Sequence, residues 1–103
     1  MAYVNTDATY YSPNATSVDV TASCTPYNPA NHAKAMVMLI HKTSGSAIVA
    51  DTVVQTNTKA TLTDSLGILP SDPRGTYYVL IVWYNFDNDP VLTAQSKDIF
   101  LTK

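Results

Sequence analysis

The chain has 103 residues, a net charge of −2 and a pI near 5.3, and only 14% of its residues are charged. This length corresponds to one domain, and the few basic residues argue against nucleic acid as a partner, since such binding begins with a basic patch. Thr occurs fourteen times, Val ten and Tyr seven, whereas Glu is absent and Arg occurs once. Because the abundant types favour strands and the scarce ones favour helices, we expect an all-β fold in a single domain over residues 1–103.

The sequence gives no sign of membrane insertion. Its longest apolar run, residues 77–84, is far shorter than the ~20 residues of a membrane-spanning helix. The N-terminus lacks the basic and apolar regions of a signal peptide. Cys24 is the only cysteine, so no internal disulfide can form. We therefore expect a cytoplasmic protein or a leaderless virion component, with the localisation itself left open.

The first expected strands differ in clarity. Residues 3–11 form a weakly patterned candidate. In residues 18–25, apolar and polar residues alternate strictly, which is typical of a strand with one buried and one solvated face. Cys24 ends the apolar row and is expected to be a small buried hydrophobe rather than a reactive thiol, because no nearby basic residue would lower its pKa.

Two later segments are apolar on both faces, namely residues 34–42 and 75–85. A sandwich strand normally buries only one face, so these two segments need an explanation. The other expected strands are residues 47–55, 59–66 and 92–101, with turns at Ser44-Gly45 and at residues 86–90. This order of about seven short strands indicates a two-sheet antiparallel β-sandwich.

One stretch resembles the E–F corner and F strand of immunoglobulin-like and fibronectin type III-like sandwiches. It consists of Leu69-Pro70 followed by Gly75-Thr76-Tyr77-Tyr78-Val79-Leu80-Ile81-Val82. The resemblance implies that Tyr78 is the corner tyrosine, whose hydroxyl bonds to the upstream backbone, and that Leu80 and Val82 enter the core. It also implies that strands 34–42 and 76–84 are neighbours in one sheet. Leu80 occupies the position of the antibody-domain cysteine. A jelly roll or another Greek-key sandwich is also compatible with the pattern.

If the two double-sided strands are neighbours, their outer rows form one apolar patch, which usually marks an interaction surface. The residues of this predicted interface are Met36, Met38, Ile40, Tyr77, Val79, Ile81 and Trp83. Self-association as a two-fold dimer is the expected use, since Trp and Tyr are frequent in interface hot spots. The alternative is that residues 25–33 or the N-terminal segment fold over the patch.

Catalytic and cofactor chemistry finds little support in the sequence. His32 and His41 have no recognisable motif around them, and neither a nucleophile elbow nor a glycine-rich phosphate loop is present. We expect no enzyme activity and no cofactor. Asn85, Asp87 and Asp89 form a weak calcium candidate, but Asn and Asp are also common turn formers, and the turn is the preferred interpretation.

The sequence therefore predicts a non-catalytic, self-associating structural or binding protein, such as an assembly subunit, a virion-type component or an adhesion module. The alternative is a small lectin that binds a glycan through exposed aromatic residues and the loop 85–89. The aromatic candidates are Tyr3, Tyr10, Tyr11, Tyr27 and Trp83. Core or interface packing of these rings is the simpler interpretation.

Overall fold

The computed structural model describes residues 2–43 and 47–102, so the turn expected at Ser44-Gly45 lies outside the described residues. The described chain forms an all-β sandwich of nine short strands and contains no helix, as the composition predicts. The strands are β1 (Ala2–Thr6), β2 (Tyr10–Tyr11), β3 (Ser17–Cys24), β4 (Lys34–His41), β5 (Ala47–Gln55), β6 (Thr61–Gly67), β7 (Gly75–Tyr84), β8 (Pro90–Gln95) and β9 (Ile99–Leu101).

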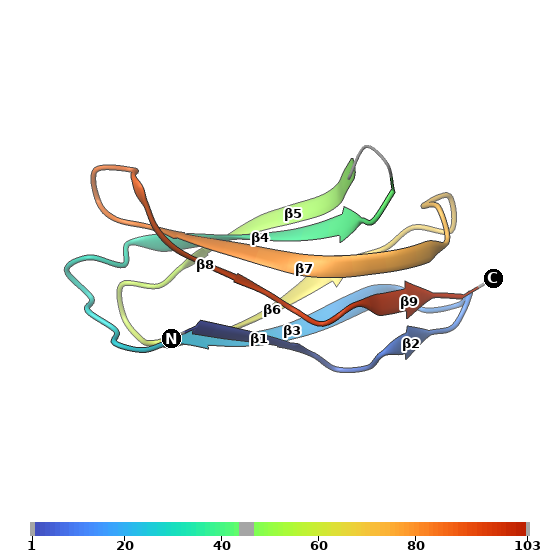
Figure 1. Ribbon diagram of the computed structural model, residues 1–103, viewed down its shortest axis with the longest axis horizontal. Helices are drawn as coiled ribbons and strands as arrows, with labels where there is room; N and C mark the ends of the chain where they lie inside the picture. The colour runs from blue at the N-terminus through green and yellow to red at the C-terminus, as the bar shows by residue number, and fades with distance from the viewer. Residues whose placement is uncertain (1, 44–46, 103) are drawn as a thin grey trace.

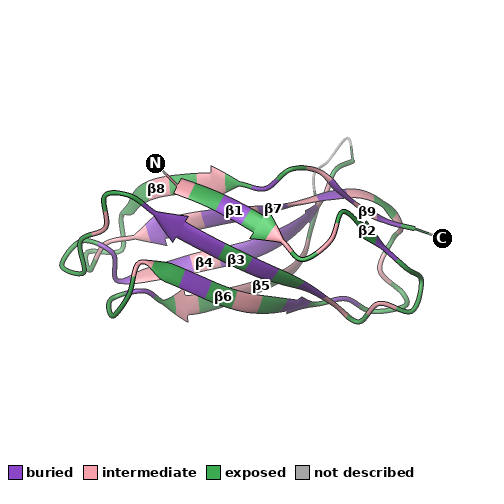
Figure 2. Ribbon diagram, turned by 90° about the horizontal axis from the view of Figure 1, so that it is seen from below, coloured by how far each residue is buried: buried purple, intermediate pink, exposed green. Residues whose placement is uncertain are grey.

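The strands form two layers (Figures 1 and 2). One is a three-stranded sheet in the order β1-β3-β6, and the other is a six-stranded sheet in the order β2-β9-β7-β4-β5 with β8 also paired to β7. The two double-sided strands, β4 and β7, are antiparallel neighbours from Lys34 opposite Tyr84 to His41 opposite Tyr77. Their predicted adjacency is confirmed.

The described residues form nine strands instead of about seven because the first and last expected strands are each divided. Residues 3–11 contribute β1 to one sheet and β2 to the other. Asp7 lies at this crossing, where its carboxylate accepts hydrogen bonds from the Tyr11 hydroxyl (2.6 Å) and from the Asp19 amide (3.1 Å). These contacts anchor the crossing to β3 and place β2 beside β9, with which it pairs in parallel.

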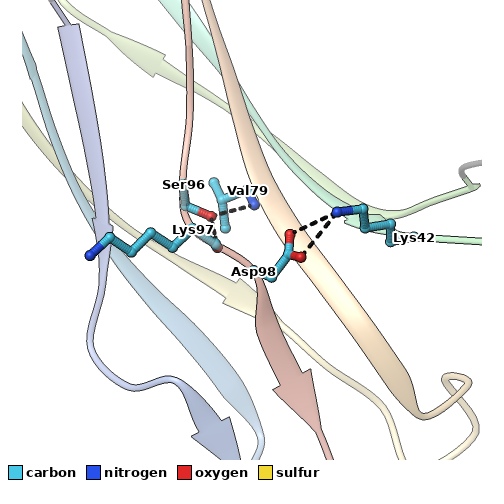
Figure 3. Close-up of polar contacts among 5 residues, drawn as sticks. All are labelled: Lys42, Val79, Ser96, Lys97 and Asp98. Atoms are coloured by element: carbon cyan, nitrogen blue, oxygen red, sulfur yellow. Dashed lines mark hydrogen bonds and ion pairs between the residues drawn. The ribbon is translucent and has the colours of Figure 1, made fainter.

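Residues 92–101 are divided at Ser96 (Figure 3). The Ser96 amide donates to the carbonyl of Val79, and the Ser96 hydroxyl accepts from the Val79 amide at 2.9 Å. The hydroxyl oxygen therefore replaces a backbone carbonyl in the ladder, so β7 remains hydrogen-bonded where the chain passes from β8 to β9.

The core lies between the sheets and combines the inward rows of both. In β3, Val18, Val20 and Ala22 are buried, as the alternation predicts, and of the polar residues between them and on either side Asp19 and Thr21 are exposed whereas Ser23 is buried. Cys24 is buried at the end of this row, which confirms its expected place, and burial raises the pKa of its thiol. The Thr52 hydroxyl on β5 donates to the Asp64 carboxylate on β6, joining the two sheets at one edge.

Candidate functional site

The predicted face assignment of β7 is wrong, because the row expected on the outer surface of the sheet lies in the core. Tyr77, Val79, Ile81 and Trp83 point inward, and each is 0% exposed in the core. The tyrosine whose hydroxyl bonds to the upstream backbone is Tyr77 rather than the predicted Tyr78, since the Tyr77 hydroxyl donates to the carbonyl of Pro73 at 2.5 Å. Both rows of this strand are apolar, so the pattern could not distinguish a phase that differs by one residue and exchanges every side chain.

Trp83 illustrates why this phase is favoured. It lies opposite Ala35 on β4 and Leu92 on β8, so the small side chain of Ala35 leaves room for the large indole ring. The indole Nε1 is buried without a hydrogen-bond partner among the described residues. Trp83 therefore contributes through packing and is not available to a partner on the surface.

The outer rows of β4 and β7 still lie side by side. The predicted row of β4, Met36, Met38 and Ile40, faces outward, and its neighbours on β7 are Val82, Leu80 and Tyr78 in that order. From β5, Val53 lies opposite Met36 and Ile48 lies opposite Ile40. We call these eight residues the outer apolar face: Met36, Met38, Ile40, Ile48, Val53, Tyr78, Leu80 and Val82.

Exposure varies across the outer apolar face. Met38 and Ile40, in its middle, are only 8% and 5% exposed, because side chains of the neighbouring strands enclose them. Ile48 and Val53, on the edge strand, are each 55% exposed. The face therefore has a closely packed centre and an exposed apolar margin along β5.

Charged side chains border the outer apolar face. At one end, Lys34 places its ammonium 5.8 Å from the centre of the Tyr84 ring. At the other, the Lys42 ammonium reaches across β7 to the Asp98 carboxylate at 3.0 Å (Figure 3). Asp51, opposite Met38, lies on the edge strand. Lys34 and Lys42 therefore mark the two ends of the apolar area along β4.

A small hollow lies beside Met36 within this face. Its volume is about 150 Å³, and its walls come from Lys34, Met36, Val53, Tyr84 and Asn88. The hollow joins the cationic end of the face to its exposed margin. It is large enough to receive one side chain of a partner, and too small for most drug-sized ligands, whose pockets span ~300–1,000 Å³.

Neither segment expected as a cover lies over the outer apolar face. Strand β1 pairs with β3 in the opposite sheet. The loop 25–33 lies at the end of the sandwich (Figure 1), where the Tyr27 hydroxyl donates to the carbonyl of Thr56 and the Thr56 amide donates to the carbonyl of Ala33. The loop is therefore tied to the β5–β6 connection.

The calcium candidate is a closed turn. The side-chain oxygen of Asn85 accepts hydrogen bonds from the amides of Asp87 and Asp89, each at 2.9 Å, and the Asn85 amide donates to the carbonyl of Asp89. Asn88 adopts a φ of 68°, which Asn tolerates better than most residues. These hydrogen bonds fit the turn interpretation, and calcium binding by Asn85, Asp87 and Asp89 stays a prediction. Among the described residues, no three His, Cys, Asp or Glu side chains gather as metal ligands would.

The aromatic residues considered for a sugar site are dispersed. Trp83 and Tyr11 are buried, and Tyr27 is half-buried against the core. Tyr3 and Tyr10 are exposed, but Tyr3 lies on the three-stranded sheet and Tyr10 stacks on Phe100 of β9 with ring centres 5.3 Å apart. They do not form one stacking platform.

The two histidines occupy packed positions. His41 ends β4 with its ring 4.6 Å from that of Tyr77, and His32 is buried within the loop 25–33.

No described residue belongs to a helix of the length and apolarity that crossing a bilayer requires. No family model matches the chain, and no curated protein is significantly similar to it.

Proposed function

We propose that the chain is a non-catalytic, self-associating structural protein that binds a second copy of itself through the outer apolar face. The observation that carries the proposal is the register of β4 and β7, which aligns two apolar rows on the side of the sheet away from the core. Apolar areas of this kind on a domain's surface are typical of interaction sites. Met and Tyr are also enriched in protein interfaces.

The charges around the face favour a second copy as the partner. Lys34 and Asp51 carry opposite charges and lie on the same side of the sheet. They are separated along the strands, because Asp51 lies opposite Met38, which is four residues after Lys34 on β4. In a two-fold contact, each Lys34 can meet Asp51 of the second copy, so one arrangement forms the pair twice. The exposed Val53 lies between these charges and can enter the hollow beside Met36 of the other copy.

We also propose that the sandwich is immunoglobulin-like. When each divided strand is counted once, β1, β3 and β6 of its three-stranded sheet are the first, second and fifth strands, and the facing sheet places β7 between β4 and the C-terminal strands, as in that architecture. The Tyr77 hydroxyl bonded to Pro73 supports the same assignment, because it occupies the corner before this strand.

Sedimentation velocity over a roughly hundredfold concentration range tests the self-association, since mass action makes a dimer dilute into monomers. We expect the parent to show a dimer that Val53→Lys converts to a monomer with an unchanged circular dichroism spectrum. Val53 is exposed, so its substitution should not disturb folding. Thr63→Lys, at an exposed position of β6, is the matched control and should remain dimeric. A parent that is monomeric throughout would overturn the proposal.

A further inference from the structure

A second feature, an open cleft at the loop end of the sandwich, lies outside the outer apolar face. It is formed where the loop 25–33 meets the start of the β7–β8 turn and the first residues of β8. Its volume is about 490 Å³, within the ~300–1,000 Å³ of small-ligand sites. The lining residues are Thr25, Pro26, Asn31, His32, Asn85, Val91 and Leu92.

His32 is a firmly held polar group in this cleft. It is only 8% exposed, and its ring packs against Tyr27 with centres 5.5 Å apart. Its backbone carbonyl accepts a hydrogen bond from the Thr56 hydroxyl. Its Nδ1 lies 2.8 Å from the carbonyl oxygen of Asn28 and 3.2 Å from the Asn28 amide nitrogen, so both polar groups of the Asn28 backbone lie against this ring nitrogen. Nε2 is therefore the ring nitrogen left to contact a ligand.

Asn85 is held just as firmly. Its side-chain oxygen is taken by the amides of Asp87 and Asp89, so its NH₂ group remains to donate. Asn31 is exposed and adds an amide that both donates and accepts. The cleft thus offers a ring nitrogen at His32, a donor at Asn85 and an amide with both capacities at Asn31.

The rest of the lining restricts the class of ligand. Pro26, Val91 and Leu92 give the cleft an apolar wall, and no residue that lines it is an acid, a lysine or an arginine. An anion would find no cation there, and a purely apolar ligand would leave the polar groups without partners. A pyranose fits this combination, because it carries neutral hydroxyls beside a surface of C–H groups.

We propose that this cleft binds a neutral sugar, with His32, Asn85 and Asn31 contacting hydroxyls and the apolar wall contacting the ring. The site needs no aromatic platform and does not depend on self-association. The proposal therefore differs from the predicted lectin, because the sugar binds in the cleft at the loop end of the sandwich rather than on exposed aromatic residues.

The test is a titration of the full chain with methyl glucoside, methyl galactoside, methyl mannoside and N-acetylglucosamine, followed by methyl NMR spectra. Concentrations should reach about 100 mM, since an open site for one sugar unit is expected to have a millimolar Kd. We expect at least one sugar to shift the Val91 and Leu92 methyl signals saturably. Asn31→Ala should then weaken binding about tenfold, the loss of roughly one hydrogen bond.

Asn14→Ala is the matched control, since Asn14 is an exposed asparagine on a different connection and does not line the cleft. It should leave the Kd unchanged. Val91→Trp, which fills the cleft from an exposed position, should abolish the shifts while the fold is retained. The proposal is overturned if no sugar gives a saturable shift, or if Asn31→Ala and Val91→Trp both bind like the parent. Neither outcome affects the sedimentation result.

Discussion

The outer faces of the two sheets differ sharply in chemistry although both belong to antiparallel strands of similar length. On the three-stranded sheet, Asp19, Thr21 and Ser23 of β3 lie beside Ser65, Thr63 and Thr61 of β6. On the six-stranded sheet, the corresponding central positions are Met, Ile, Leu, Val and Tyr. Antiparallel sheets commonly have one solvated face, and the first sheet follows that rule. The apolar composition of the second face is therefore a property of its own residues that the fold does not require.

The two rows of β7 give the largest expected contrast. Trp83→Ala should lower the free energy of unfolding by about 3–5 kcal/mol, because it removes a fully buried aromatic side chain. Val82→Ala, on the outer row, should cost about 1 kcal/mol or less in the monomer. Urea denaturation at low protein concentration measures both. Equal losses would contradict the assignment of Trp83 to the core and Val82 to the outer face.

Alkaline pH should lower the free energy of unfolding, because buried groups behind both faces would have to lose their protons. Burial raises the pKa of Cys24 behind the polar face and of Tyr77 behind the apolar one, and burial together with Asp7 raises that of Tyr11. A raised pKa means that the folded state holds the proton more tightly, so stability is complete below the ordinary values of 9.0 and 10.0 and falls above them.

Urea denaturation at pH 7.5, 9 and 10.5 checks this dependence. The midpoint should decrease as the pH rises through this range, and Tyr11→Phe should make the decrease smaller. A midpoint that rises with pH would mean that these groups ionise more easily in the folded state, contrary to their burial.

Exchanging the chemistry of the polar face tests whether composition alone produces association. The double variant Thr21→Val, Thr63→Val places two apolar side chains opposite each other on adjacent strands. We expect its mass to rise at concentrations where the parent mass is constant, with a change in unfolding free energy of about 0.5 kcal/mol or less. Thr21→Ser, Thr63→Ser is the control. An unchanged mass would show that two residues are too few to form such a surface.

The charged border should matter least. Lys42→Ala removes an ion pair whose side chains are 52% and 39% exposed, so the expected loss is about 0–1 kcal/mol and should shrink at high salt. Chemical denaturation at two ionic strengths measures it, with Lys59→Ala on an exposed turn as the control. A salt-independent loss above this range would indicate that Lys42 acts through packing on β7.

Composition and alternation predicted the all-β sandwich and the phase of β3, and the resemblance to immunoglobulin-like sandwiches predicted the adjacency of β4 and β7. The phase of β7 could not be predicted from alternation because both its rows are apolar, although Pro73, four residues before Tyr77, offered a usable corner signal. The divisions at Asp7 and Ser96 depend on distant partners, the amides of Asp19 and Val79, which no local pattern reveals. The cleft depends in the same way on a tertiary contact, the meeting of the loop 25–33 with the β7–β8 turn and β8.

The parallel pairing of β2 with β9 has a mechanical consequence. The first and last described strands leave the sandwich at opposite ends (Figure 1), and the molecule is 43 Å long. Tension between the two ends therefore runs along the strands. Because β2 and β9 are parallel, this tension slides one past the other and loads their hydrogen bonds together rather than one at a time. Under such tension, this short pair is loaded in shear.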